Sequence, residues 1–384
     1  MLADYVGFAP ATVSLVMNRS AAADSIPQRT KELIRKAATE LNYHPNFAAR
    51  SLRTQRTFSV GVVVPEISEG YEAMVLSGIE DYLLRAGYFY FVVCHRHRAD
   101  LIDEYPKLLL GRSVEGIIAV DTPWKHSLPI PVVTVSGHHQ NRGVTNVMVD
   151  HDAAAELALR HLIEMGHRRV AIIKGQEFSS DTELRWNAIE LSAQRLGLPI
   201  IPALVKQLKD DTPTPELGYR VTRKLLAARE PFTAMFAFND ITAIGAIHAL
   251  KEAGLDVPND VSVVGFDDIQ SAAFQNPALT TVRQPLRTMG KIAAETLLNR
   301  IGSRQTDCSP NSVVVEPELI VRGSTGPAPT DAVQPQGEAG TQYEGVQAPQ
   351  EGAVERLIQE TGLTKAQATK VLGALARFLV GELH

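Results

Sequence analysis

The stretch PATVSLVMN at residues 10–18 decides which fold the N-terminal part of the chain adopts. Pro10 suits the first position of a helix, where its missing N–H breaks no hydrogen bond. Val13, Val16 and Met17 then recur at helical spacing and form one apolar face. The stretch therefore predicts a short helix with one buried side, whose other residues face outward.

Helical patterns also stand on both sides of this stretch. Residues 2–6 are typical of a short helix, and Gly7 after them suits a helix stop, because glycine adopts positive φ without steric cost. Two short helices joined by a tight turn predict a helix-turn-helix, whose second helix fits the DNA major groove. A third helix is expected over residues 28–41, with Ser25 before Pro27 as its cap. Its expected buried stripe is Leu33, Ile34, Ala37, Ala38 and Leu41.

The charge of the chain is unevenly distributed. The 384 residues carry 38 Lys and Arg against 43 Asp and Glu, a net charge of −5 that by itself argues against nucleic-acid binding. Residues 1–56, however, hold eight basic and four acidic side chains, so this segment has a charge of +4 and the remainder −9. A basic end on an acidic body is typical of a polyanion-binding arm, although chance variation among solvated faces gives the same numbers.

The cysteine content and the apolar runs place the protein in the cytoplasm. Cys94 and Cys308 are too few for a disulfide framework and suit single buried positions in a reducing compartment. No apolar run approaches the roughly 20 residues that cross a bilayer, and the residues after Met1 lack a signal-peptide pattern.

The middle of the chain alternates strand-like and helical runs from about residue 60 to residue 266. Such alternation predicts an α/β fold with parallel sheets covered by helices on both faces. Ligands of open α/β sheets lie beyond the carboxyl ends of the strands. Asn239-Asp240 and Asp267-Asp268 each follow a strand-like run directly, so we expect both pairs to face a ligand cleft.

Motifs along most of the chain resemble the LacI/GalR family of bacterial transcription regulators. They occur in order and at the family's spacing over residues 2–323. They are ATVSLVMN at 11–18, LNYHPN at 41–46, ARSLR at 49–53, VGVVVP at 60–65, GHRRVA at 166–171, FND at 238–240, VSVVGFDD at 261–268 and LTTVRQP at 279–285. The resemblance implies a helix-turn-helix head on a two-lobed effector domain of doubly wound parallel sheets, the type I periplasmic-binding-protein-like fold.

The resemblance also assigns DNA-binding roles to individual residues. Pro10, Ala11 and Leu15 fall at base-contacting positions, and Thr12, Ser14 and Asn18 fall at phosphate-contacting positions. For Thr12 and Ser14 the alternative is an ordinary hydroxyl on a helix surface. Leu15 departs from the arginine often found there, so it contacts a thymine methyl in place of a guanine edge.

Residues 46–52 match the hinge helix of the family, which includes Asn46 and Ala49. A helix shorter than about 12 residues is marginal alone, so it needs DNA and a second subunit to form. Leu52 matches the leucine that wedges into the minor groove, with Arg50 and Arg53 beside it as phosphate partners. The alternative is that Leu52 is only part of a linker.

The resemblance further implies an effector site at Arg185, Asn239, Asp267 and Gln284, with Ser136 as a further candidate. Such side chains suit a polyhydroxylated, sugar-like ligand, because each hydroxyl both donates and accepts. The alternatives are a structural ion pair for Arg185 and a helix N-cap for Asp267. Trp186 fits core packing better than a sugar-stacking face. Residues 66–72, EISEGYE, replace the family's Asn-Pro-Phe-Phe run, which also admits a cationic effector.

Residues beyond 323 lie outside the resemblance. Residues 324–352 are rich in Pro, Gly and Gln and suit a flexible linker, and the apolar spacing after them weakly resembles the leading helix pair of HU-type DNA-binding proteins. We expect this extension to self-associate or to dock on the body. The expected domains are 1–45 (helix-turn-helix, short at its N-terminus), 46–57 (hinge helix and linker), 58–323 (two-lobed ligand-binding and dimerisation domain), 324–352 (linker) and 353–384 (helical extension).

The sequence therefore predicts a homodimeric or larger DNA-binding repressor that a small, carbohydrate-like effector controls. Inducing and corepressing effectors fit it equally well. The alternative is a solute-binding protein of the same two-lobed fold, which needs a signal peptide and no basic head. The acids show no paired general acid and base, and no glycine-rich nucleotide motif occurs, so we expect neither an enzyme nor a cofactor. His95 and His97 suit a loop better than a metal site.

Overall fold

The computed structural model describes residues 2–17, 21–43, 51, 56–67, 70–137, 143–210, 214–302 and 312–330. The predictions for several DNA-binding residues, for Cys308 and for the C-terminal extension lie outside these residues. The DNA-binding residues concerned are Asn18, Asn46, Ala49, Arg50, Leu52 and Arg53.

The N-terminal head is the predicted helix-turn-helix. Its helices are α1 (Leu2–Val6), α2 (Pro10–Met17) and α3 (Gln28–Glu40), with a 3-10 turn η1 (Ala21–Ser25) between the last two. Gly7 takes the left-handed conformation expected of a helix stop, with φ +68°. The core of the head consists of Leu2, Val13, Val16, Ile34, Ala37 and Ala38.

Three details of α3 correct the prediction. Leu33 and Leu41 are 49% and 42% exposed, because the short helices α1 and α2 cover only a narrow strip of α3, along Ile34 and Ala37. Ser25 does not cap the helix: its hydroxyl donates to the Ala22 carbonyl oxygen within η1, at 2.9 Å, and Pro27 holds the N-cap position without a side-chain hydrogen bond.

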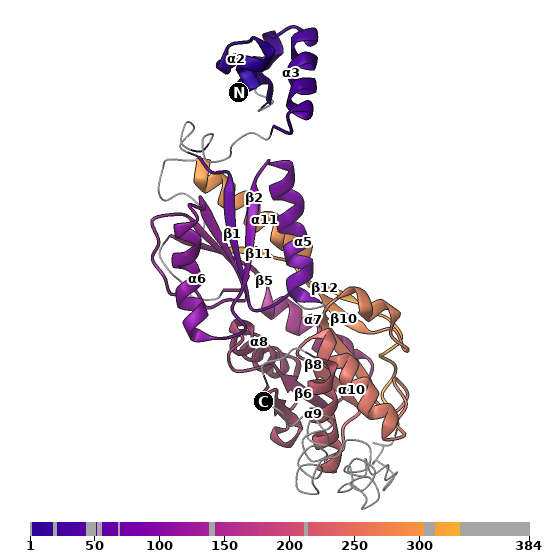
Figure 1. The fold of residues 1–384 in the computed structure, drawn as a ribbon. Coiled ribbons are helices and arrows are strands. Elements are labelled where there is room, and N and C mark those ends of the chain that lie inside the picture. The colour runs from indigo at the N-terminus through magenta and orange to yellow at the C-terminus, as the bar shows by residue number, and fades with distance from the viewer. Residues whose placement is uncertain are drawn as a thin grey trace, which may run out of the picture. The chain divides into compact units, whose positions relative to one another are not determined.

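Within the described residues, the body contains two six-stranded sheets, as the α/β prediction required. The strand orders are β11-β5-β4-β3-β1-β2 and β12-β10-β9-β8-β6-β7, parallel throughout except for the β10–β12 pair. Figure 1 shows the two lobes, with α5, α6 and α11 around the first sheet and α7 to α10 around the second.

The first lobe comprises β1 (Ser59–Val64), α5 (Tyr71–Arg85), β2 (Phe89–Cys94), α6 (Ala99–Gly111), β3 (Gly116–Val120), β4 (Val132–Val135), β5 (Val144–Val149), α11 (Leu286–Gly302) and β11 (Ser312–Val315). The second lobe comprises α7 (His151–Glu164), β6 (Val170–Lys174), α8 (Ser180–Leu196), η2 (Pro202–Leu204), β7 (Val205–Gln207), α9 (Pro215–Ala227), β8 (Ala234–Ala237), α10 (Asp240–Glu252), β9 (Ser262–Asp267), η3 (Gln270–Phe274), β10 (Thr280–Arg283) and β12 (Glu318–Ile320).

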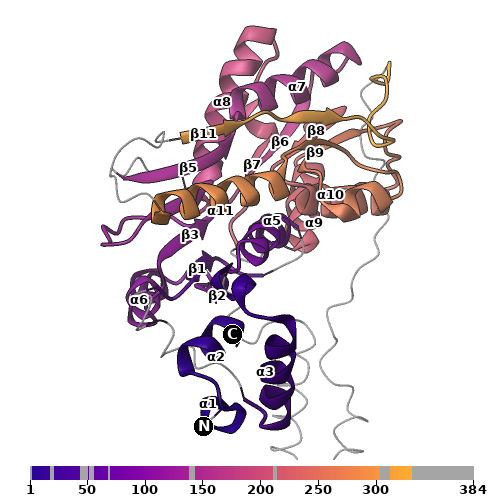
Figure 2. The same cartoon turned by 90° about the horizontal axis from the view of Figure 1, so that it is seen from above.

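The central strands β1, β3 and β4 are buried on both faces, which explains their nearly unbroken apolar runs, whereas the edge strands β2 and β11 are partly exposed. Successive residues of a strand point to opposite faces, so Val62 and Val64 pack with the α5 and α11 side while Val63 packs with Leu109 of α6. Helices α5 and α11 pack against each other (Figure 2). Their close approach requires Gly78, where a Cβ would lie 1.9 Å from the Arg287 carbonyl oxygen. Cys94, at the end of β2, is half-buried, so it is less buried than predicted.

The chain passes between the two sheets at residues 149–151, 283–286 and 315–318. The first and third crossings are joined, because the backbone N–H of Asp150 donates to the Val315 carbonyl oxygen at 3.0 Å. No helix among the described residues is long and apolar enough to cross a membrane.

Candidate functional site

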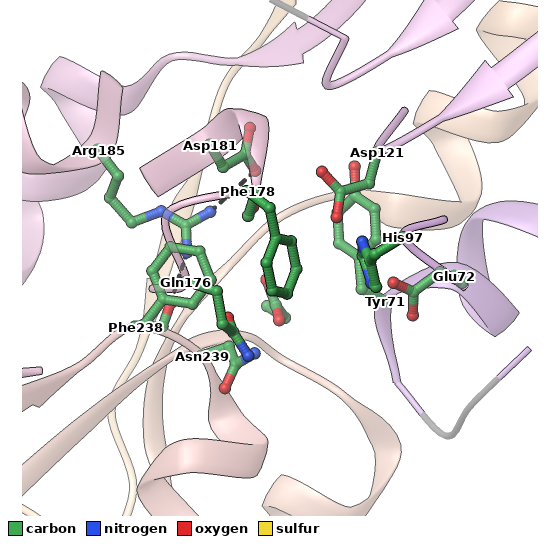
Figure 3. A pocket seen from close by; sticks show the side chains of 12 residues that line it. Tyr71, Glu72, His97, Asp121, Gln176, Phe178, Asp181, Arg185, Phe238 and Asn239 are labelled. Carbon is green, nitrogen blue, oxygen red and sulfur yellow. Dashed lines mark hydrogen bonds and ion pairs between the residues drawn. The ribbon is translucent and has the colours of Figure 1, made fainter. Parts of the chain in front are cut away.

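A cavity lies where the carboxyl ends of the two sheets face each other. We call it the cleft cavity. Its lining follows β1, β2 and β3 of the first sheet and β6, β8 and β9 of the second, as expected for a ligand site of parallel sheets. The lining residues are Tyr71, Glu72, His97, Asp121, Gln176, Phe178, Ser179, Asp181, Arg185, Phe238, Asn239 and Asp267 (Figure 3). The space between the walls is about 540 Å³, open solvent at its mouth included.

Arg185 of α8 forms the deepest polar feature of the second-lobe wall and is 3% exposed. Its guanidinium donates to the Phe238 carbonyl oxygen at 2.5 Å and to Asp181 at 3.1 Å. The Phe266 ring lies 3.7 Å from the guanidinium carbon, a cation–π distance. Arg185 therefore forms the ion pair given as its structural alternative and lines the cavity as well. Its Nε has no hydrogen-bond partner among the described residues, so this N–H can donate to a ligand.

Asp267, the last residue of β9, lines the cavity beside this arginine. It is 5% exposed, and its φ of +114° is a strained backbone conformation for a residue with a Cβ. Gln284 donates to its Oδ1 at 2.7 Å. Burial raises the pKa of Asp267 well above its ordinary value, and the charge of Arg185 opposes that shift. The N-cap position of η3 belongs to Ile269, so Asp267 does not cap that turn.

The neighbouring acids do not face the cavity, which corrects the expectation for both pairs. Asp240 is fully buried and accepts hydrogen bonds from the Thr281 hydroxyl at 2.6 Å and the Ile269 N–H at 2.9 Å. Asp268 pairs with Arg283 and Arg322. Asp240 thus joins the start of α10 to β10 and to the segment after β9, and Asp268 joins the end of β9 to Arg283 of β10 and to Arg322.

Asn239 has a structural bond and a place in the lining. It is the N-cap of α10, and its Oδ1 accepts from the Thr242 N–H at 2.9 Å. Of the five predicted effector residues, the lining therefore contains Arg185, Asn239 and Asp267. Gln284 and Ser136 lie behind it, where Gln284 holds Asp267 and Ser136 accepts from the Tyr71 hydroxyl at 2.7 Å.

Tyr71, His97 and Phe178 are aromatic lining residues that the sequence prediction did not assign. Tyr71 begins α5, and burial together with the nearby Asp181 raises its pKa well above the ordinary value, so its hydroxyl stays a donor. The rings of His97 and Phe178, from different lobes, lie 4.1 Å apart between centroids. All three residues follow the carboxyl end of a strand, and this rule, applied to every strand, would have found them.

Within the described part of the chain, no group of three or more His, Cys, Asp or Glu is placed to hold a metal ion. His95 is fully buried, its Nδ1 accepts from the His97 N–H at 3.1 Å, and its Nε2 lies 3.0 Å from the Thr122 hydroxyl. The interpretation as a loop was right for the backbone but missed that His97 lines the cavity. Trp186 lies outside the lining, against the core, with Lys174 over its ring at 4.4 Å.

The outer side of α2 is the second candidate surface. Val13 and Val16 are buried, whereas Pro10 and Ala11 are exposed and Leu15 is half-buried. Among the described residues proposed to contact DNA, Pro10 and Ala11 are thus exposed, and Thr12, Ser14 and Leu15 are half-buried. A helix-turn-helix head on a two-lobed body with a polar cavity defines the class of effector-controlled, DNA-binding transcription regulators.

Known proteins place the chain more closely. The family model of bacterial regulatory proteins, lacI family, matches residues 2–46, and that of the periplasmic binding protein-like domain matches residues 159–325. The HTH-type transcriptional repressor PurR of Haemophilus influenzae (strain ATCC 51907 / DSM 11121 / KW20 / Rd) is 33% identical over 334 residues, 84% of this chain and 97% of that protein.

Two solved structures share the architecture. The lac repressor dimer bound to operator and the anti-inducer ONPF has a TM-score of 0.74 at 24% identity, covering 85% of this chain and 98% of that one. The transcriptional regulator CelR–cellobiose complex has a TM-score of 0.62 at 29% identity, covering 84% and 98%. The chain belongs to the LacI family: it is a DNA-binding transcriptional repressor, not an enzyme, that a small effector bound in the two-lobed domain regulates.

Proposed function

We propose that α2 reads the operator, with Pro10, Ala11 and Leu15 at base edges and Thr12, Ser14 and Asn18 at phosphates. The support is the packing of the head, which buries Val13 and Val16 and leaves Pro10 and Ala11 exposed. Base contacts specify a sequence, whereas phosphate contacts only position the protein. Because Leu15 is apolar, a thymine methyl is its natural partner.

The hinge residues complete the DNA contact in this proposal. Asn46, Ala49, Arg50, Leu52 and Arg53 form a short helix that pairs with that of a second subunit, since a helix below about 12 residues is marginal alone. Leu52 wedges into the minor groove and kinks the duplex, and the two arginines hold phosphates. A homodimer then reads a near-palindromic operator in the cytoplasm. The proposed domains are 1–45, 46–57, 58–323, 324–352 and 353–384, and the body extends into the start of the fourth, because the Val263 N–H donates to the Ser324 carbonyl oxygen at 2.8 Å.

The effector is a carbohydrate-like compound held in the cleft cavity by Arg185, Asn239 and Asp267, with Gln284 and Ser136 behind them. One observation carries this assignment: a wall of buried polar groups around Arg185 faces the rings of Tyr71 and Phe178. Polar groups that donate and accept suit hydroxyls, and ring faces suit the apolar side of a sugar. The cellobiose complex of CelR supports the same ligand class.

The test uses the full chain. Operator duplexes are selected from a random pool with the wild-type protein, and binding is then measured by fluorescence anisotropy with cellobiose, ribose or nucleosides added. We expect a sugar to change operator affinity and to raise the melting temperature, because a ligand of the folded state stabilises it by mass action. A response to nucleosides alone would show that the effector is a nucleoside and not a sugar. A failure to select any operator would refute the DNA assignment.

The wedge is tested with Leu52→Ala. We expect operator affinity to fall about tenfold and affinity for random duplex to change little, since the wedge acts at the kinked centre of the specific site. Leu191→Ala is the matched control, because Leu191 is an exposed leucine of α8, 52% accessible. Equal losses on operator and random DNA would remove Leu52 from the minor groove.

A further inference from the structure

A cluster of polar side chains stands at the amino ends of β1, β2 and β3, the end of the first sheet opposite the cleft cavity. Glu115 precedes β3, Tyr88 precedes β2, and residues 56–58 precede β1. These three strands are neighbours in the sheet, in the order β3-β1-β2. We call Glu115, Tyr88 and residues 56–58 the linker clamp, because residues 56–58 are the chain's entry into the body.

Both oxygens of Glu115 are occupied by this entry segment. Oε1 accepts from the backbone N–H groups of Thr57 and Phe58, at 2.6 and 2.8 Å. Oε2 accepts from the Arg56 guanidinium, at 2.8 Å from the terminal nitrogen and 3.2 Å from Nε. One carboxylate oxygen thus binds backbone N–H groups, and the other binds a side chain.

Further contacts close the clamp around this carboxylate. The Tyr88 hydroxyl donates to Oε2 of Glu115 at 3.1 Å, and Arg56 also bonds to that hydroxyl oxygen. The Thr57 hydroxyl donates to the Ser113 carbonyl oxygen at 2.7 Å. The Arg56 guanidinium lies over the Phe58 ring, 4.8 Å from its centroid. Charge-assisted bonds with several partners fix one geometry better than a single exposed ion pair.

The electrostatics keep the clamp charged. Burial pushes the pKa of Glu115 upward, but the hydrogen bond from Arg56 and those from the Phe58 and Thr57 N–H groups outweigh it and leave the pKa below its ordinary value. Burial and the Glu115 charge raise the pKa of Tyr88 to about 12, so its hydroxyl remains a donor. The Glu115 side chain is only 13% exposed.

We propose that the linker clamp is the anchor that sets operator specificity: Glu115 and Arg56 are positioning residues that fix the chain just before β1, from which the DNA-binding segments extend. The inference rests on the proposed DNA-binding function. A held anchor lowers the entropy that the preceding segment loses on binding the operator. Random DNA needs no defined geometry of the two heads, so it does not depend on the anchor.

The test compares operator and random-duplex affinity of the full chain, using the duplex that the wild-type protein selects. We expect Arg56→Met and Glu115→Gln each to weaken operator binding about tenfold, and random-duplex binding by less than twofold. Because both act on one anchor, the double variant should cost no more than either single variant. Arg56→Lys keeps the charge toward Glu115 and should restore part of the loss.

The matched control is Arg287→Met, which breaks an ion pair of the same lobe with the same 2.8 Å separation, to Asp81. It should leave the ratio of operator to random-duplex affinity unchanged. Wild-type operator affinity in Arg56→Met, or equal losses on both duplexes, would overturn the proposal. If Glu115→Gln lowers the melting temperature, Arg56→Met still tests the proposal. The Arg56 side chain is 39% exposed, and its replacement leaves the bonds from the Thr57 and Phe58 N–H groups to Glu115 in place. Operator selection by the wild-type protein tests the proposed function separately.

Discussion

The cleft cavity and the linker clamp differ in how their polar atoms are used. Arg185 Nε at the cavity wall and Gln284 Oε1 behind the wall are buried without a hydrogen-bond partner among the described residues. In the clamp, both oxygens of Glu115 accept from several donors. A buried polar group without a partner costs free energy, so such a group marks a place kept for a ligand. A group whose hydrogen-bonding atoms are all occupied, such as Glu115, holds the local conformation of the chain.

The two sites also stand at opposite ends of the same strands. Tyr71, His97 and Asp121 follow β1, β2 and β3, whereas the clamp residues precede them. Of these strands, β1 and β3 are buried along their whole length, so close-packed strands connect the two sites. If the cavity is the end that binds the effector, substitutions in its lining should change effector affinity and leave operator affinity unchanged.

The largest effect is expected for Asp267→Asn. The substitution keeps the size of the side chain and the acceptor for Gln284, but it replaces the second carboxyl oxygen, an acceptor in the cavity, by an amide nitrogen that only donates. A buried polar group that loses its partner costs roughly 1–3 kcal/mol, so effector affinity should fall by up to about 100-fold. Titration of the sugar that responds in the operator assay measures the loss.

Operator affinity of this variant without effector should equal that of the wild type, because the clamp is untouched. Glu183→Gln on the exposed side of α8 controls for the loss of a negative charge. An unchanged effector affinity would remove Asp267 from the site.

The second prediction concerns acid stability. Burial, and to a smaller extent the charge of His97, lowers the pKa of His95 to about 4. An unfolded histidine titrates near 6.5, so the stability that neutral His95 contributes is complete above pH 6.5 and is lost as the pH falls toward 4. Between pH 7 and pH 5 the loss is about 2 kcal/mol.

His95→Gln removes this titration, so its free energy of unfolding should fall about 2 kcal/mol less over the same interval. Urea unfolding followed by tryptophan fluorescence measures it, because Trp124 and Trp186 both lie in the body. Burial also lowers the pKa values of His161 and His167, but these groups are common to both proteins. Equal losses of unfolding free energy in the wild type and in His95→Gln would show that protonation of His95 does not destabilise the protein over this pH interval.

The smallest effect is expected for Phe178→Ala. Phe178 is 39% exposed and supplies both a ring face of the cavity and the contact with His97 of the other lobe. Aromatic contacts of this kind contribute roughly 0.5–1.5 kcal/mol, so effector affinity should fall up to about tenfold. Phe274→Ala, at a phenylalanine 87% exposed and outside the cavity, should change nothing. A loss as large as that of Asp267→Asn would mean that closure of the lobes dominates binding.

Local patterns were enough for the parts of the fold that depend on near neighbours in the chain. The helix at residues 10–17, the stop at Gly7 and the alternation of strands with helices all follow from spacing and glycine chemistry. Packing between helices and strands was harder to predict from the sequence. Leu33 and Leu41 fit the apolar spacing of α3, yet no partner covers them, because coverage depends on where α1 and α2 end.

The candidate site divides in the same way. Asn239 and Asp267 could be assigned from their motifs and from their places at strand ends, and Arg185 from the family resemblance; all three line the cavity. The same rule misjudged Asp240 and Asp268, since position after a strand does not say which way a carboxylate turns. Tyr71, His97 and Phe178 were missed because the strand-end rule was applied only to the strands before Asn239 and Asp267.

The sequence by itself determined the class of this protein, because the helix-turn-helix spacing, the basic head and the family motifs are local properties that survive without coordinates. Only the tertiary structure decided which polar groups are free for a ligand and which are consumed by the fold. Arg185 and Glu115 look alike in a sequence as charged residues near strands. Their partners, 53 residues away at Phe238 and 59 residues away at Arg56, distinguish the lining of a cavity from an anchor.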